Sequence, residues 1–223
     1  MTVSDLLKSR ISTRAFLDKP VSEEQVREIL DIARWAPSGG NLQPWRVHVV
    51  VGQGRDRLVA AVKKSIAENL LADESELDVY PPKLGEPWRT RRFEVGEAMY
   101  ALLGIPRDDK PAQIAHLMRN YEFFGAPAGL FFSLHRQFDK GQWAHLGMLM
   151  QSVALVAAEK GLATCMQEAW AARAKTVSAF LNLSENEQLY CGMALGYADT
   201  GAKVNELRSS RADVDEIAEF IRK

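Results

Sequence analysis

Ala36-Pro37-Ser38-Gly39-Gly40-Asn41-Leu42-Gln43-Pro44-Trp45 separates an amphipathic helix from an apolar strand, and the rest of the chain is organised around it. Pro37 ends the helix, because proline has no backbone N–H and disfavours helix at the residue before it. The two glycines let the backbone approach a flat or anionic group, while Asn41 and Gln43 supply amide donors and acceptors. From local chemistry alone, an ordinary turn explains these residues better than a binding loop does.

Two clusters of arginine and serine lie near opposite ends of the chain. The first is Ser9-Arg10-Ile11-Ser12-Thr13-Arg14-Ala15-Phe16, and the second is Arg208-Ser209-Ser210-Arg211. Guanidinium and hydroxyl groups in such sets hold a phosphate by charge-assisted hydrogen bonds. Surface arginines that bind nothing are the commoner explanation for either cluster alone. The sequence leaves open whether the two clusters converge on one phosphate.

Hydrophobic spacing predicts alternating helices and strands along most of the chain. Ser22-Glu23-Glu24-Gln25 is a capping box, and Val26, Ile29, Leu30 and Ala33 follow it on one helix face. The apolar run from Trp45 to Val51 predicts a strand buried on both faces. Further helices are expected at 55–71, 93–103, 108–124, 142–160, 173–181 and from 213, and strands at 129–134, 163–166 and 189–197. With no internal repeat or low-complexity linker, we expect residues 1–223 to form a single domain.

The segment 72–92 is long and irregular but carries aromatic residues. It contains Tyr80-Pro81-Pro82-Lys83 and, further on, Trp88. A loop of this length in a compact domain is usually functional or disordered, and its aromatic content argues against simple disorder. A lid over a pocket, a dimer arm and a solvated excursion all stay open.

Composition and charge exclude several classes of function. The chain has 223 residues, 47% of them hydrophobic and 26% charged, with a net charge of −1. No electrostatic field from the net charge therefore favours binding to nucleic acid or an anionic membrane. Neither a signal peptide nor a membrane span is recognisable, so we expect a cytoplasmic protein. Cys165 and Cys191 lie in apolar segments, which favours buried thiols. The four histidines are scattered, so we expect no metal site.

No set of acid, base and nucleophile stands out, and neither a dinucleotide fingerprint nor a Walker loop is present. This suits an enzyme whose reactive centre is a cofactor, bound and tuned by protein groups.

Taken together, Arg10-x-Ser12-x-Arg14-x-Phe16 and Ala36-Pro37-Ser38-Gly39-x-Asn41-x-Gln43-Pro44-Trp45 resemble the FMN-dependent nitroreductase family. Residues 161–168, Gly196-Tyr197 and the Arg208/Arg211 tail extend the resemblance from about Ser9 to Arg211. The Tyr80 segment and residues 119–127 look most like the branch that includes nitrobenzoate-type reductases.

This resemblance implies an α+β fold with a central mixed, mainly antiparallel sheet flanked by helices. It also implies an intertwined homodimer with FMN at the interface and NAD(P)H as co-substrate. Nitroaromatics, quinones or similar electron-poor acceptors would then be reduced by ping-pong hydride transfer through flavin N5. The alternatives are reductive dehalogenation, enone reduction or flavin breakdown on the same fold, or a non-catalytic flavin-binding protein.

The resemblance also implies which residues contact the cofactor. Arg10, Ile11, Ser12 and Arg211, assisted by Arg208, would hold the phosphate and ribityl chain, and Arg14 would lie by the pyrimidine edge. Pro37, Ser38, Gly39 and Asn41 would come from the partner subunit and cover the flavin. The backbone amide of Glu168 would reach N5 beside Gln167 and Ala169, and Asn120 would bond the pyrimidine ring. Many members have glycine where this chain has Ala169 and Trp170, which leaves the contacts there open.

Four aromatic residues are candidates for a substrate wall, with core or dimer packing as the alternative for each: Tyr80, Trp88, Phe123 and Phe124. No protein side chain is expected to act as a covalent catalyst, and no metal is expected.

Overall fold

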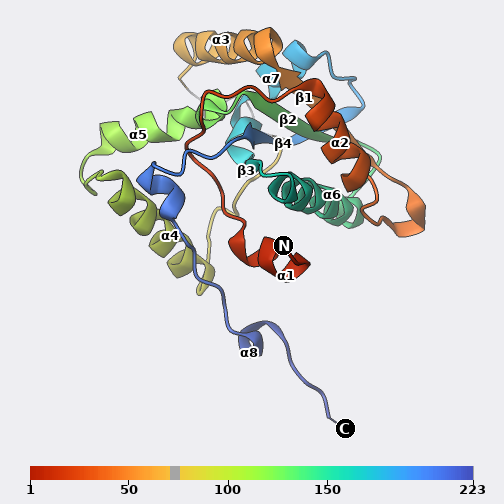
Figure 1. Cartoon of the computed structure of the whole chain (residues 1–223), viewed down its shortest axis with the longest axis vertical. Coiled ribbons are helices and arrows are strands. Elements are labelled where there is room, and N and C mark those ends of the chain that lie inside the picture. The colour runs from red at the N-terminus through yellow and green to blue at the C-terminus, as the bar shows by residue number, and fades with distance from the viewer. Residues whose placement is uncertain (71–75, 223) are drawn as a thin grey trace.

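The computed structural model describes residues 1–70 and 76–222, and it is built on one four-stranded sheet. The strands lie in the order β1 (Trp45–Val51), β2 (Ala128–His135), β4 (Glu187–Gly196) and β3 (Ala163–Gln167). All three pairings are antiparallel, with Val49 opposite Leu130 and Cys165 opposite Ala194. Figure 1 shows helices on both sides of this sheet, which confirms the expected α+β fold.

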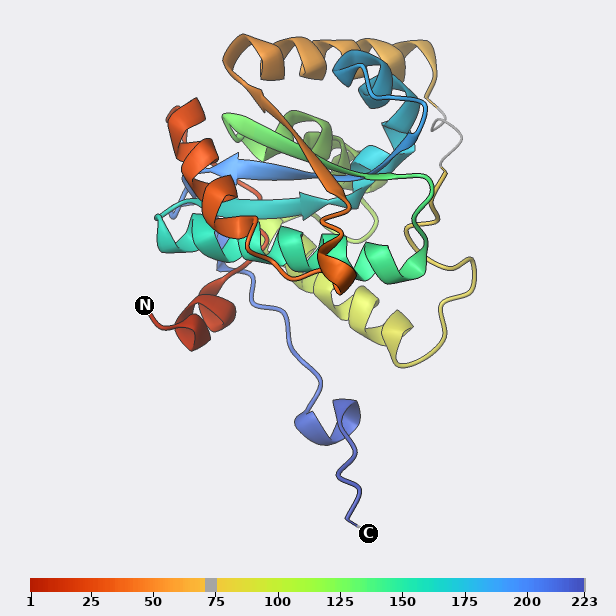
Figure 2. The ribbon, with the colours of Figure 1, turned by 90° about the vertical axis from the view of Figure 1, so that its right-hand side faces the viewer.

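Helices cover both faces of the sheet because β2 and β4 are apolar on both sides. On one face lie α2 (Glu23–Ala33) and α6 (Lys140–Glu159), and on the other lie α3 (Gly52–Glu68) and α7 (Ala174–Leu181). Figure 2 shows the sheet between α3 and α6. The predicted capping box is confirmed, since the Ser22 side chain accepts the Gln25 N–H and the Gln25 side chain accepts the Ser22 N–H.

The remaining helices stand away from the sheet. They are α1 (Val3–Ser9), α4 (Trp88–Leu103), α5 (Lys110–Met118) and α8 (Val214–Ile217). The short 3-10 segments are η1 (Gly39–Asn41), η2 (Arg119–Gly125), η3 (Glu168–Arg173) and η4 (Lys203–Glu206), of which η2 and η3 pack against β4. No residue of α4 is buried. This layer therefore leaves room between itself and the sheet, and the candidate site lies there.

Three expectations about local structure were wrong. Helix α4 begins at Trp88, five residues before the expected start, and residues 72–75 of the expected irregular segment lie outside the described part. The helix expected at 108–124 ends at Met118, where the 3-10 segment η2 begins, and Phe123 and Phe124 at the end of η2 adopt positive φ. The helical spacing also predicted Ile114 and Leu70 on buried faces of the helices at 108–124 and 55–71, but Ile114 is 56% exposed and Leu70 is 85% exposed beyond the end of α3.

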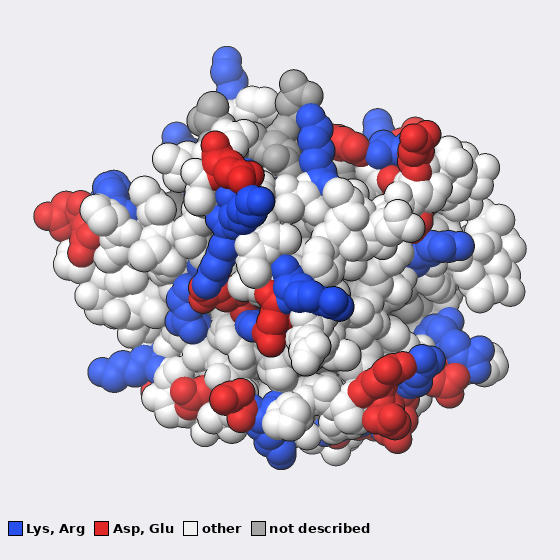
Figure 3. Space-filling view, turned by 90° about the horizontal axis from the view of Figure 1, so that it is seen from above, with Lys and Arg blue, Asp and Glu red and all other residues white. Residues whose placement is uncertain are grey.

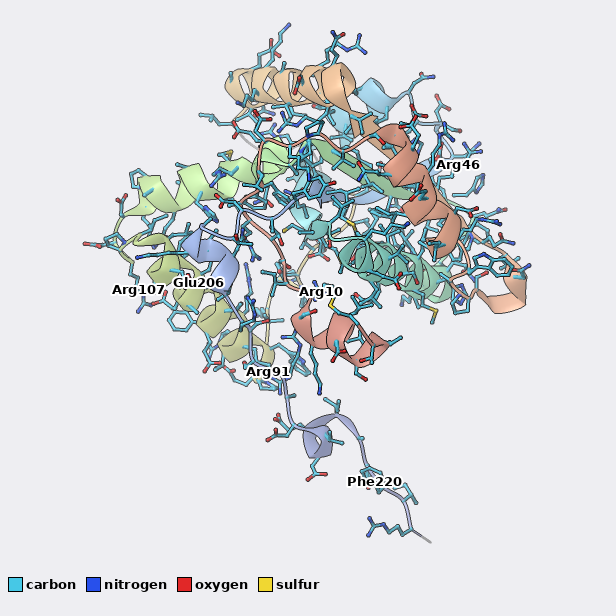
Figure 4. The ribbon with its side chains drawn as sticks, viewed as in Figure 1. Arg10, Arg46, Arg91, Arg107, Glu206 and Phe220 are labelled. Atoms are coloured by element: carbon cyan, nitrogen blue, oxygen red, sulfur yellow. The ribbon has the colours of Figure 1, made fainter. Side chains whose placement is uncertain are left out.

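The C-terminal tail leaves the body of the chain as an extended arm (Figure 1). Asp213 caps α8 as expected, but the helix ends after four residues. The apolar side chains of Val214, Ile217, Phe220 and Ile221 are exposed along the arm. Arg91 of α4, labelled in Figure 4, pairs with Glu216 at 2.6 Å, and this ion pair ties α8 to α4.

Charges of both signs are interspersed on the face seen in Figure 3. Across residues 1–70 and 76–222, no helix is long and apolar enough to cross a membrane. The same residues contain no group of three histidine, cysteine, aspartate or glutamate side chains placed to hold a metal ion.

Candidate functional site

The N-terminal arginine segment is fastened to the end of the sheet by its backbone. The Thr13 N–H donates to the Thr164 carbonyl at 3.0 Å, and Phe16 forms an isolated antiparallel bridge with Ala198. The Leu17 N–H donates to the Tyr197 carbonyl at 2.9 Å. Residues 13–17 therefore run beside the ends of β3 and β4, and the arginines before and within this segment face the tail that follows β4.

One side chain joins this segment to the C-terminal tail. The Oδ1 atom of Asn205 accepts the Arg14 N–H at 2.8 Å, and its Nδ2 atom donates to the carbonyls of Ala15 and Asp199 at 2.8 Å each. The Arg208 guanidinium in turn donates to the Asn205 carbonyl at 3.0 Å. Because Asn205 is only 8% exposed, these bonds hold the two arginine clusters together in a dry setting.

The two clusters converge on one cavity of about 370 Å³, which we call the arginine cavity. Its walls carry five cationic side chains and no carboxylate. Among described residues, none of the five forms an ion pair. The lining residues are Leu7, Lys8, Arg10, Ile11, Ser12, Arg14, Val95, Leu207, Arg208, Ser209 and Arg211. Uncompensated positive charge of this kind is complementary to a phosphate.

A second cavity of about 550 Å³, the central cavity, shares Arg14 with the first. It lies between α4 and α5 on one side and β3 with the start of η3 on the other. Its walls include Tyr80, Arg92, Met99, Tyr100, His116, Asn120, Phe124, Cys165, Gln167, Glu168, Ala169 and Tyr190. The arrangement offers a phosphate site joined at Arg14 to a cavity large enough for an aromatic ring system.

The exit from β3 is held rigidly by side chains. The Gln167 Nε2 atom donates to the Asn120 carbonyl at 2.8 Å and to its Oδ1 atom at 3.3 Å, and its Oε1 atom accepts the Trp170 indole N–H at 3.3 Å. The Tyr121 hydroxyl donates to the Ala169 carbonyl at 3.1 Å. The Gln167 amide therefore holds Asn120 and η3 in place, and these bonds keep it from a ligand.

Tyr190 fixes the carboxylate at the centre of this wall. Its hydroxyl donates to Glu168 Oε1 at 3.0 Å. Burial and the Glu168 carboxylate both raise the pKa of the Tyr190 hydroxyl above its usual range, so it stays a hydrogen-bond donor. The negative charge in the cavity wall is thereby already bonded within the chain.

The wall of the central cavity holds a buried histidine, His116 of α5. His116 is 7% exposed, its Nε2 atom has no hydrogen-bond partner, and its ring packs on Phe124 with a centroid distance of 5.7 Å. Burial, with smaller effects of Arg119 and Arg14, lowers the pKa of His116 to about 4. The sequence could have indicated this position, because His116 precedes Asn120, a predicted flavin contact, by about one helical turn.

The chain matches the model of the nitroreductase family over residues 7–197. It is 34% identical over 223 residues to a nitrobenzene nitroreductase of Ectopseudomonas oleovorans, covering 98% of this chain and 96% of the relative. It is 38% identical to a 4-nitrobenzoate reductase of Pseudomonas putida, with 92% and 89% covered. A solved FMN- and NADPH-dependent nitroreductase NfnB of Sphigopyxis sp. strain HMH superposes with a TM-score of 0.96, at 44% identity and full coverage of both chains.

This chain belongs to the nitroreductase family. Membership confirms the resemblance carried by the two N-terminal motifs, and the structural match confirms the nitroreductase fold.

Within this nitroreductase chain, the Pro37 loop lies outside both cavities. The Gly39 N–H donates to His145 Nε2 at 3.3 Å, and a Cβ at Gly39 would lie 3.1 Å from the His145 ring. Gly40 adopts a φ of +58°. Packing and turn geometry therefore explain both glycines inside one chain, and none of Pro37, Ser38, Gly39 and Asn41 lines either cavity.

The four candidates for the substrate wall differ in burial and in whether they line the central cavity. Tyr80 and Phe124 line the central cavity, although Phe124 is 3% exposed. Phe123 is fully buried against Phe131 and Trp170, as the packing alternative describes, and it does not line the central cavity. Trp88 is 59% exposed at the start of α4, outside the residues that line the central cavity.

Both cysteines of the nitroreductase chain are buried and free. Burial raises the pKa of the Cys165 thiol to about 11 and raises that of Cys191 further. Although both border the central cavity, neither forms a thiolate at neutral pH, so neither serves as a nucleophile.

Proposed function

We propose that this chain is an FMN-dependent NAD(P)H oxidoreductase that reduces nitroaromatics and similar electron-poor acceptors. The observation that carries the proposal is the junction of the arginine cavity with the central cavity at Arg14. FMN combines a phosphate, a flexible chain and a flat ring system in that order. The family and the FMN- and NADPH-dependent relative support the same assignment.

The donor set fits FMN. The phosphate and ribityl chain would be held by Arg10, Ser12, Arg208 and Arg211. No described carboxylate lines this cavity beside its cationic side chains. Asn120 already donates to the Leu117 carbonyl at 2.8 Å and accepts from Gln167, so its amide orientation is set before a ligand arrives. An oriented amide offers one donor and one acceptor, which matches the imide edge of a flavin.

When bound, FMN accepts hydride from NAD(P)H and delivers it to the acceptor. Arg14 would contribute a positive charge at the pyrimidine edge, where it stabilises negative charge during reduction. The Glu168 backbone amide, with Gln167 and Ala169 beside it, would donate a hydrogen bond to the reacting edge. The bonds that hold η3 would keep that amide in place, and the buried wall around His116 would exclude water.

We also propose a homodimer with a flavin site completed by the partner's Pro37 loop. Apolar side chains stay exposed in one chain on several elements and on the C-terminal arm, among them Leu7 of α1, Ile114 of α5, Met148 of α6 and Phe220 of the arm. Such an extent of exposed apolar surface favours an interface. Light scattering of the eluting protein should give twice the 24.9 kDa of one chain. A monomer at micromolar concentration with flavin bound would contradict the dimer.

The visible spectrum of the purified protein tests the function. We expect flavin bands that bleach with NADPH or NADH without oxygen and return when a nitroaromatic is added. Initial rates at several fixed acceptor concentrations should give parallel double-reciprocal lines, since nicotinamide and acceptor would use the central cavity in turn. A colourless protein that takes up no FMN would contradict the proposal, and FMN binding without bleaching would favour a non-catalytic flavin-binding protein.

A further inference from the structure

The central cavity has one cation that the proposed cofactor does not use. Among the described residues, its arginine, carboxylate and imidazole side chains are Arg14, Arg92, Glu168 and His116, and burial lowers the pKa of His116 to about 4. Arg14 borders both cavities and is assigned to the flavin, and Glu168 accepts a hydrogen bond from Tyr190. Arg92 is left as a positive charge facing the space beside the ring system.

Arg92 differs from its two neighbouring arginines on α4. Arg89 pairs with Glu86 at 2.6 Å and Arg91 pairs with Glu216 at 2.6 Å. Within the described part of the chain, the Arg92 guanidinium has neither a carboxylate partner nor a hydrogen bond. Helix α4 also explains the difference, because Arg92, Met99 and Tyr100 lie on one helix face, and this face lines the central cavity.

An aromatic ring holds the Arg92 guanidinium in place. Its Cζ atom lies 4.2 Å from the centroid of the Tyr80 ring, which also borders the cavity. A guanidinium stacked on a ring keeps its N–H groups at the edge free, in the planar fork that pairs with a carboxylate. Arg92 is therefore oriented for an anion, although no described residue supplies one.

We propose that Arg92 binds the carboxylate of an aromatic acceptor in the central cavity, so that this chain prefers nitrobenzoate-like acceptors to neutral nitroaromatics. This inference rests on the proposed function. A single guanidinium matches the single charge of a carboxylate, whereas the phosphate site in the neighbouring cavity gathers five cations. The aromatic walls Tyr80, Tyr100 and Phe124 are complementary to the ring that carries the carboxylate.

A pair of acceptors of equal shape tests the proposal: 4-nitrobenzoate and its neutral amide, 4-nitrobenzamide. The wild-type protein should have the higher kcat/KM for nitrobenzoate. Arg92→Gln should lower the ratio of the two kcat/KM values about tenfold, and Arg92→Lys should restore part of it, since lysine keeps the charge but not the fork. Arg89→Gln is the matched control, because it removes a paired arginine of the same helix and should leave the ratio unchanged.

Binding without turnover gives a second readout. Benzoate and benzamide should perturb the oxidised flavin spectrum, and the ratio of their dissociation constants should shift about tenfold in Arg92→Gln. Added salt should weaken benzoate binding more in the wild type than in this variant.

Equal ratios of the two kcat/KM values in wild type and Arg92→Gln would overturn the proposal. Reduction of nitrobenzamide in the same assays would still support the proposed function. A changed preference for NADPH over NADH with an unchanged carboxylate ratio would also overturn it, because the anion would then be the 2′-phosphate. A protein that binds no FMN would remove the proposed function, and this inference with it.

Discussion

The Oδ1 atom of Asn205 accepts a hydrogen bond from the Arg14 backbone N–H at 2.8 Å, across 191 positions of sequence. This bond and two from Asn205 Nδ2 make the N-terminal arginine segment and the C-terminal tail a single structural unit. The arginine cavity therefore depends on an amide that does not itself line either cavity.

Asn205→Ala should destabilise the fold and weaken FMN binding together. The substitution leaves the Arg14 N–H without its partner and removes one of the two hydrogen bonds that each of the Ala15 and Asp199 carbonyls accepts, which costs about 2 kcal/mol in total. Urea unfolding and an FMN titration measure the two effects. Asn186→Ala, at an exposed asparagine, is the control and should change neither. Full FMN affinity in Asn205→Ala would show that the two arginine clusters come together without the hydrogen bonds of the Asn205 side chain.

Arg10→Gln should lower the preference for FMN over riboflavin, which lacks the phosphate. Removing one of five cations from the arginine cavity should raise the FMN dissociation constant about tenfold, with a smaller change for riboflavin. Flavin fluorescence titration measures both constants. Arg46→Gln is the charge-matched control, since Arg46 lies in β1, far from Arg10 in Figure 4. An equal loss of affinity for both flavins would place Arg10 away from the phosphate.

Gly192→Ala should destabilise the chain by about 3 kcal/mol, because a Cβ there would lie 2.4 Å from Trp170 Cδ1. Trp170 is fully buried, so the indole has no space into which to move. Gly54→Ala in α3 meets no atom within 4 Å and should stabilise the helix by about 0.5 kcal/mol. Chemical denaturation of both variants measures the change in the free energy of unfolding. An unchanged free energy in Gly192→Ala would show that η3 moves aside more easily than its contacts indicate.

His116 should make stability fall as the pH drops from 6.5 towards 4. Burial lowers the pKa of His116 in the folded chain from 6.5 to about 4, so in this range the unfolded chain binds a proton that the folded chain does not. The penalty is absent above pH 6.5 and complete below pH 4. Because His116 borders an open cavity, we expect about 1 kcal/mol between pH 7 and pH 5.

His116→Gln should remove this part of the pH dependence, which urea unfolding at pH 7 and pH 5 would show. The other three histidines stay in place, so the difference between wild type and variant isolates His116. An identical pH dependence in both proteins would mean that His116 is protonated in the folded chain.

Local patterns in the sequence predicted most elements correctly. The capping box at Ser22 and the spacing of Val26, Ile29 and Ala33 predicted α2, because helix caps and faces depend on residues three or four positions apart. The same reasoning failed for Ile114, since an apolar helical stripe does not say whether the chain itself or a partner covers it. It also missed the end of α5, where the positive φ of Phe123 and Phe124 depends on packing in the core.

By itself, the sequence determined the family, the α+β class and the two arginine clusters, because short motifs and local periodicity carry that information. Only the tertiary structure decided that the clusters meet, that Asn205 joins them, and that His116 and Arg92 face the same cavity. These relationships join residues far apart in the sequence, and antiparallel pairing and side-chain packing bring them together. No local propensity encodes such contacts, because they form only when the sheet positions its ends against the tail and α4.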